Sequence, residues 1–229
     1  INLLKIMDEI SIKNIIFSSS ATVYGVPKYL PYDELHPVKP INPYGNTKFM
    51  IEKIIEDWSN SDKHNCGVSL RYFNPIGAHS SGKIGEDPFG VPRNLMPYIT
   101  QVAIGRRPHL NIYGNDYDTR DGTCERDYVD VVELAKAHKC AVKKLMDFDK
   151  FECFNIGSGS GITVLELVNA FERSTGKKIP FKFCNRRDGD LPSFFAKCDK
   201  ANKDLDWKHN STAESMCASH WKWQENNPD

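Results

Sequence analysis

Helix-like and strand-like patterns alternate along the first 74 residues of the chain. Apolar residues recur at helical spacing in 1–10 and 43–59, and strand-like runs occupy 14–20 and 67–73. This alternation is typical of parallel strands that are joined by helices. We therefore expect an α/β fold in which residues 1–74 form the closing half of a doubly wound parallel sheet.

The rest of the chain, residues 75–229, begins differently. Gly and Pro are frequent over 75–125 and interrupt any long pattern. We expect short elements and a second, smaller α/β domain. The expected elements are a helix near 94–104, a strand near 109–113, a helix over 129–146, a strand near 152–156, a helix over 163–175, a strand near 180–184 and a helix over 212–225. Trp221 and Trp223 are expected to dock the last helix.

Tyr44 and Lys48 are the first candidates for chemistry. Four residues separate them, so on a helix their side chains share a face. An ammonium group beside a phenol favours the phenolate, which can accept the proton of a sugar or alcohol hydroxyl. Asn42 and Pro43 provide a helix cap and a proline suited to the first helical position. A Tyr–Lys pair on a solvated helix face is the alternative interpretation.

The same spacing occurs at Tyr24 and Lys28, which shows that spacing alone proves little. Gly25 and Pro27 lie between them, so this segment cannot be a regular helix interior. We therefore place the chemistry at Tyr44 and not at Tyr24.

The run Asn14-Ile15-Ile16-Phe17-Ser18-Ser19-Ser20 gives the Tyr–Lys pair a context. It is a short apolar, branched run that ends in hydroxyl side chains, as a buried parallel strand would. Ligands of open α/β sheets bind beyond the carboxyl ends of the strands, where Ser20 would lie. A strand-end hydroxyl followed by Tyr-x-x-x-Lys on the next helix resembles the short-chain dehydrogenase/reductase superfamily. A turn after a strand is the alternative for the serines.

Further motifs narrow this resemblance to the UDP-glucose 4-epimerase (UDP-galactose 4-epimerase) family of the extended superfamily. The segments occur in the family's order and span nearly the whole chain. They are Ser18-Ser19-Ser20-Ala21-Thr22-Val23-Tyr24-Gly25, Asn42-Pro43-Tyr44-Gly45, Leu70-Arg71-Tyr72-Phe73-Asn74-Pro75, Gly85-Glu86-Asp87-Pro88, Asn94-Leu95-Met96-Pro97-Tyr98, Tyr113-Gly114-Asn115-Asp116-Tyr117, Arg126-Asp127-Tyr128-Val129 and Arg186-Arg187-Asp188-Gly189-Asp190.

The resemblance implies an isomerase that interconverts UDP-glucose and UDP-galactose at C4 in galactose metabolism, with NAD as its cofactor and a 4-keto intermediate. Residues 1–74 would belong to the NAD-binding Rossmann domain and 75–229 to the UDP-sugar domain, some of whose elements pack back on the sheet. Tyr44 would be the catalytic base and acid, with Lys48 and Ser20 as catalytic partners. Ser20, Tyr44, Lys48 and Phe73 would contact the cofactor. The family usually works as a homodimer.

The same resemblance implies a set of substrate-binding residues. Arg126 and Arg187 match the family's diphosphate arginines, Arg186 being the neighbour less suited to that contact, and Asp190 would accept from a ribose hydroxyl. The remaining positions are Asn74, Asn94, Leu95, Asn111, Ile112, Tyr113 and Phe194. Taken singly, each arginine could be a surface ion pair, Asn74 a turn residue and Asn94 a helix cap.

Two departures from the family pattern bear on this site. Cys124 stands where the family often has Gly, which would strain a turn that needs a positive φ, and the Glu125 carboxylate could compete with phosphate for Arg126. Phe194 occupies the position that tunes sugar size. Its ring should leave little room for an N-acetyl group, so we expect a preference for UDP-glucose and UDP-galactose.

The family's front end has no match in this sequence. A strand, a Gly-x-x-Gly-x-x-Gly turn and a helix normally seat the cofactor pyrophosphate, and about the first hundred residues of the family pattern are not present. We therefore expect this chain alone to bind NAD weakly and to be impaired in turnover. The glycine-rich run Gly157-Ser158-Gly159-Ser160-Gly161 lacks a glycine at 162 and is interpreted as a tight structural turn.

Composition and charge argue against several other classes of protein. Apolar residues make up 40% and charged residues 26%, and the formal net charge is zero, which argues against a general nucleic-acid surface. No run of about eighteen apolar residues indicates a membrane span. Seven scattered cysteines without a C-x-x-C pair indicate reduced thiols in the cytoplasm and no metal site.

Two alternatives to the epimerase remain from sequence. One is another nucleotide-sugar enzyme of the superfamily, such as a 4,6-dehydratase or a decarboxylase. Acidic residues after Ser20 would indicate a dehydratase, but Ala21 and Thr22 follow it. The other is a non-catalytic nucleotide-binding fragment.

Overall fold

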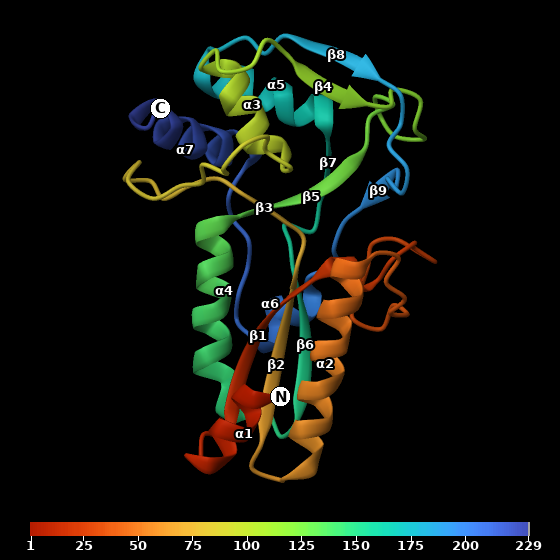
Figure 1. The fold of residues 1–229 in the computed structure, drawn as a ribbon, viewed down its shortest axis with the longest axis vertical. Helices are drawn as coiled ribbons and strands as arrows, with labels where there is room; N and C mark the ends of the chain where they lie inside the picture. The colour runs from red at the N-terminus through yellow and green to blue at the C-terminus, as the bar shows by residue number, and fades with distance from the viewer. Residues whose placement is uncertain (229) are drawn as a thin grey trace. The chain divides into compact units, whose positions relative to one another are not determined.

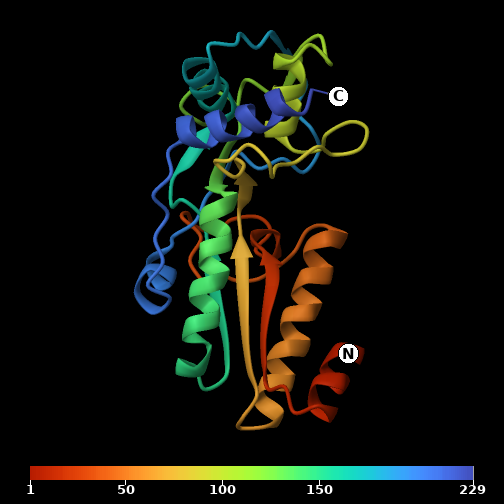
Figure 2. The same ribbon diagram turned by 90° about the vertical axis from the view of Figure 1, so that its left-hand side faces the viewer.

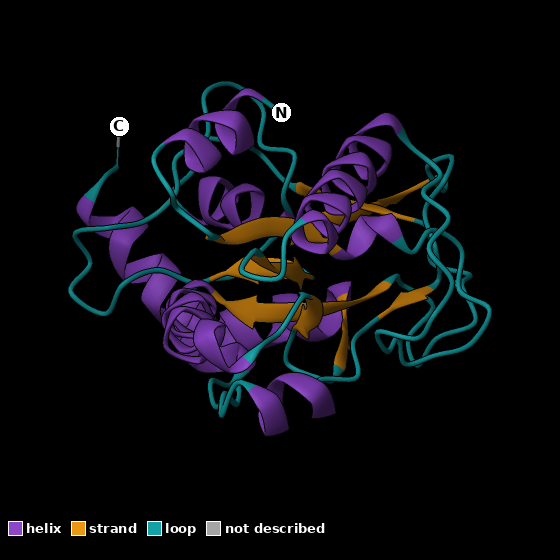
Figure 3. Cartoon of the chain, turned by 90° about the horizontal axis from the view of Figure 1, so that it is seen from below, coloured by secondary structure: helices purple, strands orange, loops and turns teal. Residues whose placement is uncertain are grey.

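The computed structural model describes residues 1–228, which form two compact units. Unit 1 comprises residues 1–73, 134–159 and 196–208, and unit 2 comprises residues 74–133, 160–195 and the described residues from 209 onward. Each unit is therefore assembled from three separate stretches of chain. In both units the strands are flanked by helices (Figure 3).

Unit 1 contains a three-stranded sheet in which all pairs are parallel. The strands are β1 (Asn14–Ser20), β2 (Cys66–Tyr72) and β6 (Phe151–Ile156), in the order β1-β2-β6. The register places Ser20 beside Tyr72 and Tyr72 beside Ile156, so the carboxyl ends of the three strands are level. Among the described residues β1 is an edge strand, since it pairs only with β2. This arrangement confirms the expected Rossmann-type parallel sheet.

Helices cover both faces of this sheet (Figures 1 and 2). Because successive side chains of a strand point to opposite faces, Ser19 reaches α2 while Ser18 reaches α4. The helices of unit 1 are α1 (Asn2–Glu9), α2 (Pro43–Ser61), the part of α4 (Val131–Lys144) from Leu134 onward, and α6 (Asp199–Asp204). Short 3₁₀ turns follow β1 at Ala21–Val23 and α4 at Leu145–Asp147.

The start of α2 follows from its first residues. The Asn42 side chain accepts a hydrogen bond of 2.7 Å from the Gly45 N–H, and Pro43 occupies the first helical turn. A side-chain cap satisfies one of the amide groups that a helix start leaves without a partner. Gly45 has no room for a side chain, because an added Cβ would lie 2.7 Å from the Thr22 carbonyl oxygen. The helix therefore begins in close contact with the turn that follows β1.

Unit 2 is built around β5 (Glu125–Asp130). Strands β3 (Asn74–Ile76) and β9 (Ser193–Phe194) pair with it in parallel and β7 (Gly161–Thr163) antiparallel. A separate two-stranded parallel sheet joins β4 (Leu110–Tyr113) to β8 (Phe181–Cys184). The helices are α3 (Leu95–Ala103), α5 (Val164–Thr175) and α7 (Ala213–Asn226).

The core of unit 2 lies among these three helices and the strands. Met96, Ile99, Phe171 and Met216 are almost completely buried in it, together with Trp221. The Trp221 ring meets the Phe171 ring edge to face with centroids 5.9 Å apart. Trp223 is also buried. The expected role of both tryptophans in docking the last helix is confirmed.

Every helix and strand that the pattern predicts is present, with ends that differ by a residue or two. One end is wrong in an informative way: residues 129–130 end strand β5, and the helix expected over 129–146 begins at Val131. The strand itself was not predicted, because Glu125, Asp127 and Asp130 are buried charged residues that break any apolar run. Helix α6 and the short strands β3, β7 and β9 were also missed.

The glycine-rich run at 157–161 leads into β7 and not directly into a helix. Gly159 has a φ of +81°, the left-handed region that glycine tolerates best, and Gly161 already belongs to the strand. Helix α5 begins only at Val164, where Thr163 and Glu166 form a capping box. The turn therefore connects two strands, which agrees with a structural role.

We predict that unit 2 loses stability in mild acid because of His220. This side chain is fully buried in α7, and burial lowers its pKa from 6.5 to about 4. Between these two pH values the unfolded chain binds a proton that the folded chain does not, so the free energy of unfolding falls as pH decreases. The shift corresponds to a loss of about 3 kcal/mol on going from pH 7 to pH 4.

Urea unfolding of the wild-type chain and of His220→Gln between pH 4 and pH 7 measures this effect. The variant should show a flatter pH dependence whatever its absolute stability. His64→Gln, a substitution at an exposed histidine, serves as the control and should leave the pH dependence unchanged. Parallel curves for wild type and His220→Gln would contradict the prediction.

Candidate active site

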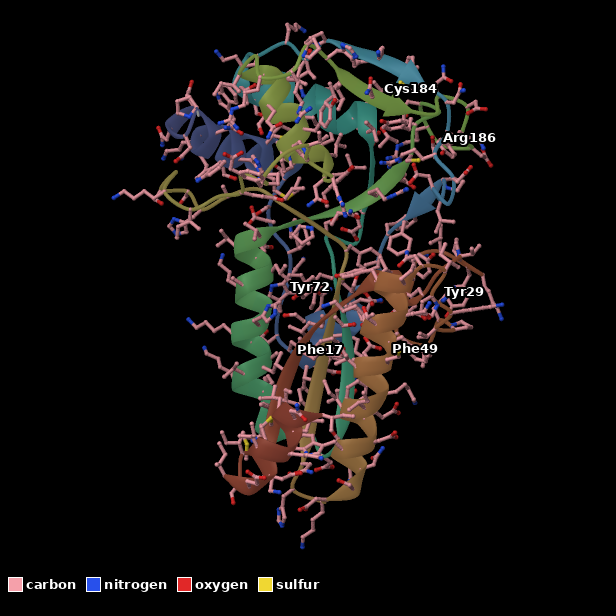
Figure 4. The ribbon with its side chains drawn as sticks, in the orientation of Figure 1. Phe17, Tyr29, Phe49, Tyr72, Cys184 and Arg186 are labelled. Atoms are coloured by element: carbon pink, nitrogen blue, oxygen red, sulfur yellow. The ribbon has the colours of Figure 1, made fainter. Side chains whose placement is uncertain are left out.

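Tyr44 and Lys48 lie on one face of the first turns of α2, as their spacing predicts. Tyr44 is 55% exposed, and the Lys48 ammonium lies 5.6 Å from the centroid of the Tyr44 ring. Lys48 Nζ donates a 2.7 Å hydrogen bond to the Ser18 carbonyl oxygen and lies 5.0 Å from the centroid of the Phe17 ring on β1 (Figure 4). The lysine is thus fixed between the tyrosine and the end of β1.

Ser20 ends β1 in the extended conformation, and its side chain is buried. Its Oγ accepts hydrogen bonds from the N–H of Thr22 at 3.3 Å and from the Thr22 hydroxyl at 3.0 Å. The hydroxyl proton of Ser20 can therefore still be donated to another group. Phe73, predicted to lie near the nicotinamide, follows β2 and is buried, and its N–H donates to the Ile156 carbonyl oxygen.

Tyr72 and His138, to which the sequence analysis assigns no role, adjoin this group. Tyr72, at the carboxyl end of β2, is half-buried (Figure 4). Burial raises the pKa of Tyr72, a hydrogen bond with Ser18 opposes this rise, and the charge of Tyr44 adds to it. His138 on α4 lies with its Nε2 3.2 Å from the Ser18 hydroxyl. Only the parallel register and the packing of α4 bring these side chains together.

Unit 2 contains a cavity of about 540 Å³. Its walls come from β3, α3, β4 and β5, and from the loop after β8. The lining residues are Asn74, Pro75, Ile76, Val91, Pro92, Arg93, Asn94, Leu95, Tyr98, Leu110, Asn111, Ile112, Tyr113, Cys124, Arg126, Tyr128, Val164, Arg187 and Asp190. The volume is within the range of small-molecule sites.

The cavity collects most of the substrate-binding residues predicted from sequence. Those that line it are Asn74, Asn94, Leu95, Asn111, Ile112, Tyr113, Arg126, Arg187 and Asp190. Phe194 is not among the lining residues; it is half-buried in β9 and paired with Arg126 in the sheet. Sequence positions from 74 to 190 thus converge on one place in the fold.

Two arginines and one aspartate determine the charge of the cavity. Arg126 Nη1 donates to the carbonyl oxygens of Glu125 at 2.8 Å and Leu191 at 2.7 Å, and its Nη2 lies 3.7 Å from Asp190 Oδ1. Arg187 Nε donates to Asp190 Oδ2 at 2.8 Å. The two cations share one carboxylate, so this part of the cavity suits an anion.

The neighbouring Arg186 has a different environment. Its Nε donates to Asp116 Oδ1 at 2.7 Å, and its guanidinium group lies 4.2 Å from the centroid of the Tyr117 ring. It follows Cys184, the last residue of β8 (Figure 4), and does not line the cavity. Of the two adjacent arginines, Arg187 therefore lines the cavity and Arg186 does not.

The structure shows the environment of the first departure from the family pattern, at Cys124 and Glu125. Cys124 is not among the described residues that have a positive φ, so it introduces no strain there. Glu125 does not engage the side chain of Arg126; its carboxylate accepts a 2.6 Å hydrogen bond from Arg120 Nη1. The expected competition between Glu125 and phosphate for Arg126 is therefore wrong, because the two side chains leave opposite faces of β5.

Strand β5 explains which lining residues sequence reasoning missed. Arg126 and Tyr128 lie on this strand and Cys124 just before it; they recur at every second position and line the cavity, whereas Glu125 and Asp127 are buried between them. Arg126 is expected there from the sequence, but Cys124 and Tyr128 are not predicted as lining residues. A period of two is the signature of one strand face. The alternation of residues 124, 126 and 128 is present in the sequence, but it indicates a shared face only when residues 125–130 are known to form a strand.

One buried acceptor in the cavity wall has no protein partner. Asn111 lines the cavity, and within residues 1–228 no hydrogen-bond partner reaches its Oδ1. Buried polar atoms are usually satisfied, so an unsatisfied acceptor at a cavity suggests a ligand that donates a hydrogen bond.

The described part of the chain contains neither a candidate metal cluster nor a helix that could span a membrane. No group of three or more His, Cys, Asp or Glu side chains within residues 1–228 could hold a metal ion. None of the helices described is both long enough and apolar enough to cross a bilayer.

Comparison with protein families places the chain among nucleotide-sugar enzymes. The family model described as GDP-mannose 4,6 dehydratase matches residues 1–220. The UDP-glucose 4-epimerase of Bos taurus is 53% identical over 229 residues, and that of Homo sapiens is 52% identical. Both alignments cover the whole of this chain and 66% of the relative. The chain thus spans just under two thirds of the length of these curated relatives.

Solved structures agree with the sequence comparison. The UDP-glucose 4-epimerase of Stenotrophomonas maltophila, solved with bound NAD and formylated UDP-arabinopyranose, is 43% identical with a TM-score of 0.96. That of Bifidobacterium longum, in complex with NAD⁺ and UDP, is 47% identical with a TM-score of 0.92. These alignments cover 99% of this chain and 67% and 68% of the solved chains. The chain therefore belongs to the UDP-glucose 4-epimerase family.

Proposed function

We propose that these residues provide the UDP-sugar site and the proton-transfer group of an NAD-dependent epimerase that interconverts UDP-glucose and UDP-galactose. The observation that carries the proposal is the cavity of unit 2, where two arginines, an aspartate and several asparagines gather from distant parts of the sequence. The relatives with bound UDP or a UDP-sugar support the choice of nucleotide.

Each part of a UDP-sugar has a chemically suitable partner in this cavity. Arg126 and Arg187 would bind the diphosphate, since guanidinium groups form strong paired hydrogen bonds with phosphate oxygens. Asp190, which already orients both arginines, would accept from a ribose hydroxyl. The unpaired Oδ1 of Asn111 would accept a hydrogen bond from an N–H of the base. Asn74, Asn94, Leu95, Ile112 and Tyr113 complete the proposed contacts.

Tyr44 would move the proton of the sugar. It would accept the proton of the 4-hydroxyl and later return it, while Lys48 stabilises the phenolate and Ser20 orients the hydroxyl. Lys48 Nζ donates one hydrogen bond to the Ser18 carbonyl oxygen, so its two other N–H groups could bind Tyr44 and a ligand. The exposure of Tyr44 is what a group that must meet its substrate requires.

The same residues suit a nicotinamide cofactor. Beside the carboxyl ends of β1 and β2, helix α2 presents the Lys48 ammonium and the Tyr44 phenol, and β1 ends in the Ser20 hydroxyl, a donor set that a ribose and a nicotinamide ring would use. We assign Lys48, Tyr44, Ser20 and Phe73 to this contact. When bound, NAD supplies the hydride chemistry at C4 of the sugar, by way of the 4-keto form.

A 4,6-dehydratase is less well supported, even though the matching family model carries that description. Elimination of water needs an additional acid near the sugar. The residues that follow Ser20 are Ala21 and Thr22, and Thr22 is hydrogen-bonded back to Ser20. We therefore retain epimerisation, with a place in galactose metabolism.

We further propose a homodimer in the cytoplasm. The exposed side of α2 carries Met50, Ile51 and Ile54, an apolar surface suited to a second copy of the chain. None of the seven cysteines forms a disulfide within the described residues, which is compatible with a reducing compartment.

Replacement of Tyr44 by Phe tests the proposed base. The ring and the helix remain, but the group that accepts the proton is lost. We expect kcat for conversion of UDP-galactose to fall about 10²- to 10⁴-fold with little change in KM, in assays with added NAD. Tyr29→Phe, at another exposed tyrosine, is the control. Turnover of the Tyr44 variant at the wild-type rate would remove this residue from the mechanism.

The adjacent arginines allow a matched test of the diphosphate contact. Arg187→Met should weaken UDP binding about 10- to 100-fold, because one charge-assisted contact is lost. Arg186→Met should change it by less than about threefold, since Arg186 pairs with Asp116 outside the cavity. Titration calorimetry of the purified chain with UDP measures both values. Equal losses in the two variants would contradict the assignment.

Phe194 provides a test of sugar specificity. If its ring limits space near the sugar, the epimerase should turn over UDP-galactose well and UDP-N-acetylgalactosamine poorly. Phe194→Ala should raise the relative kcat/KM for the N-acetyl sugar by about tenfold. Equal use of both sugars by the wild-type protein would refute the prediction.

A further inference from the structure

Glu52 is a charged side chain buried in unit 1, on the helix that carries Tyr44 and Lys48. It is 2% exposed and lies one turn after Lys48 and two turns after Tyr44. Nothing in the proposed reaction requires a carboxylate at this position. A buried charge costs free energy, so its presence calls for a physical explanation.

The carboxylate of Glu52 is completely satisfied by hydrogen bonds from both neighbouring strands. Its Oε1 accepts from the Ser19 hydroxyl at 2.5 Å, the Ser69 hydroxyl at 3.0 Å and Arg71 Nε at 3.0 Å. Its Oε2 accepts from Arg71 Nη2 at 2.6 Å. The paired contact with the guanidinium group fixes direction as well as distance.

These contacts join α2 to β1 at the two residues just before Ser20. Lys48 Nζ is bound to the carbonyl oxygen of Ser18, and Glu52 is bound to the hydroxyl of Ser19. Successive turns of the helix are thus tied to successive residues of the strand. A sliding or rotation of α2 by a fraction of a turn would break both contacts.

The network continues behind Arg71 to the third strand. Arg71 Nη1 donates to the Tyr24 hydroxyl at 3.2 Å, and that hydroxyl donates to Asn155 Oδ1 at 2.6 Å. Arg71 is itself 6% exposed. The group that holds Glu52 is therefore anchored to β2 and β6 and cannot follow a movement of the helix.

We propose that Glu52 is a positioning residue for proton transfer: its carboxylate sets the register of α2 on β1 and so holds Lys48 and Tyr44 at the working distance from Ser20. This inference rests on the proposed function. An apolar pair of similar volume could hold the helix with comparable stability, but it would not specify one register. Reaction rates are sensitive to such placement, since a displacement of about 1 Å can cost about 10²-fold.

Two serines permit a matched comparison. Ser19 and Ser69 are both completely buried, and both donate to the same oxygen of Glu52, one from β1 and the other from β2. Ser19→Ala removes the hydrogen bond between Glu52 and β1, the strand that ends in Ser20. Ser69→Ala removes the hydrogen bond between Glu52 and β2. If Glu52 acts by positioning, Ser19→Ala should lower kcat about tenfold and Ser69→Ala by less than about threefold, for similar losses of thermal stability.

Glu52→Gln, which retains size but not charge, should lower kcat for UDP-galactose about 10- to 100-fold. Its KM and its affinity for UDP should remain within about twofold of wild type. Ile55→Val, a buried apolar change on the same helix, is the control that lowers stability without altering kcat.

A readout that does not depend on turnover completes the test. In NMR spectra with labelled lysine and tyrosine, the Lys48 and Tyr44 signals should shift in Glu52→Gln and Ser19→Ala but not in Ile55→Val. If neither the wild type nor any variant turned over UDP-galactose, the proposed function would fail. The spectra would still test whether Glu52 positions Lys48 and Tyr44. The inference would be overturned if the Lys48 and Tyr44 signals did not shift and if kcat in Ser19→Ala and Ser69→Ala fell only in proportion to the loss of stability.

Discussion

A carboxylate enclosed between a helix and two parallel strands must have every lone pair directed at a donor, and this requirement organises unit 1. Glu52 meets it with two serine hydroxyls and a forked arginine, so Ser19, Ser69 and Arg71 must face α2. The alternation of strand side chains then sends Ser18, Ser20 and Tyr72 to the opposite face. One satisfied charge thereby determines which hydroxyls are structural and which remain available at the end of the sheet.

Unit 2 differs in that three buried carboxylates lie along one strand, β5. Strand β5 places Glu125 and Asp127 on the face away from the cavity, where Glu125 binds Arg120, and at the strand end Asp130 caps α4 through the N–H groups of Val132 and Glu133. The opposite face presents Arg126 and Tyr128 to the cavity. Strand β5 has partners on both edges, and the carboxylates of Glu125 and Asp130 each have a donor, which stabilises these charges where they are buried.

Sequence reasoning recovers those features whose signal is local. The cap at Asn42 and the apolar stripe of α2 predict the helix, and the branched run before Ser18 predicts the strand. The family motifs predict which residues gather in the cavity. Patterning cannot find β5, because its charged residues interrupt the apolar pattern around Tyr128 and Val129, and the pairing of Glu125 with Arg120 is not visible in the sequence. The sequence does not predict His138 and Tyr72 as neighbours of Ser18, because their proximity follows from packing between segments more than fifty residues apart.

The interleaving of the two units restricts how such an enzyme can diversify. The proposed proton-transfer residues Ser20, Tyr44 and Lys48 all lie within residues 1–73, but the residues that line the cavity extend from 74 to 190 and enclose the stretch 134–159 that belongs to unit 1. Exchange of the segment that encodes the cavity would therefore also replace part of the sheet of unit 1. New ligand specificity in this architecture is therefore reached most simply by point substitutions at residues that line the cavity, such as Cys124, and not by the transfer of a ready-made binding module.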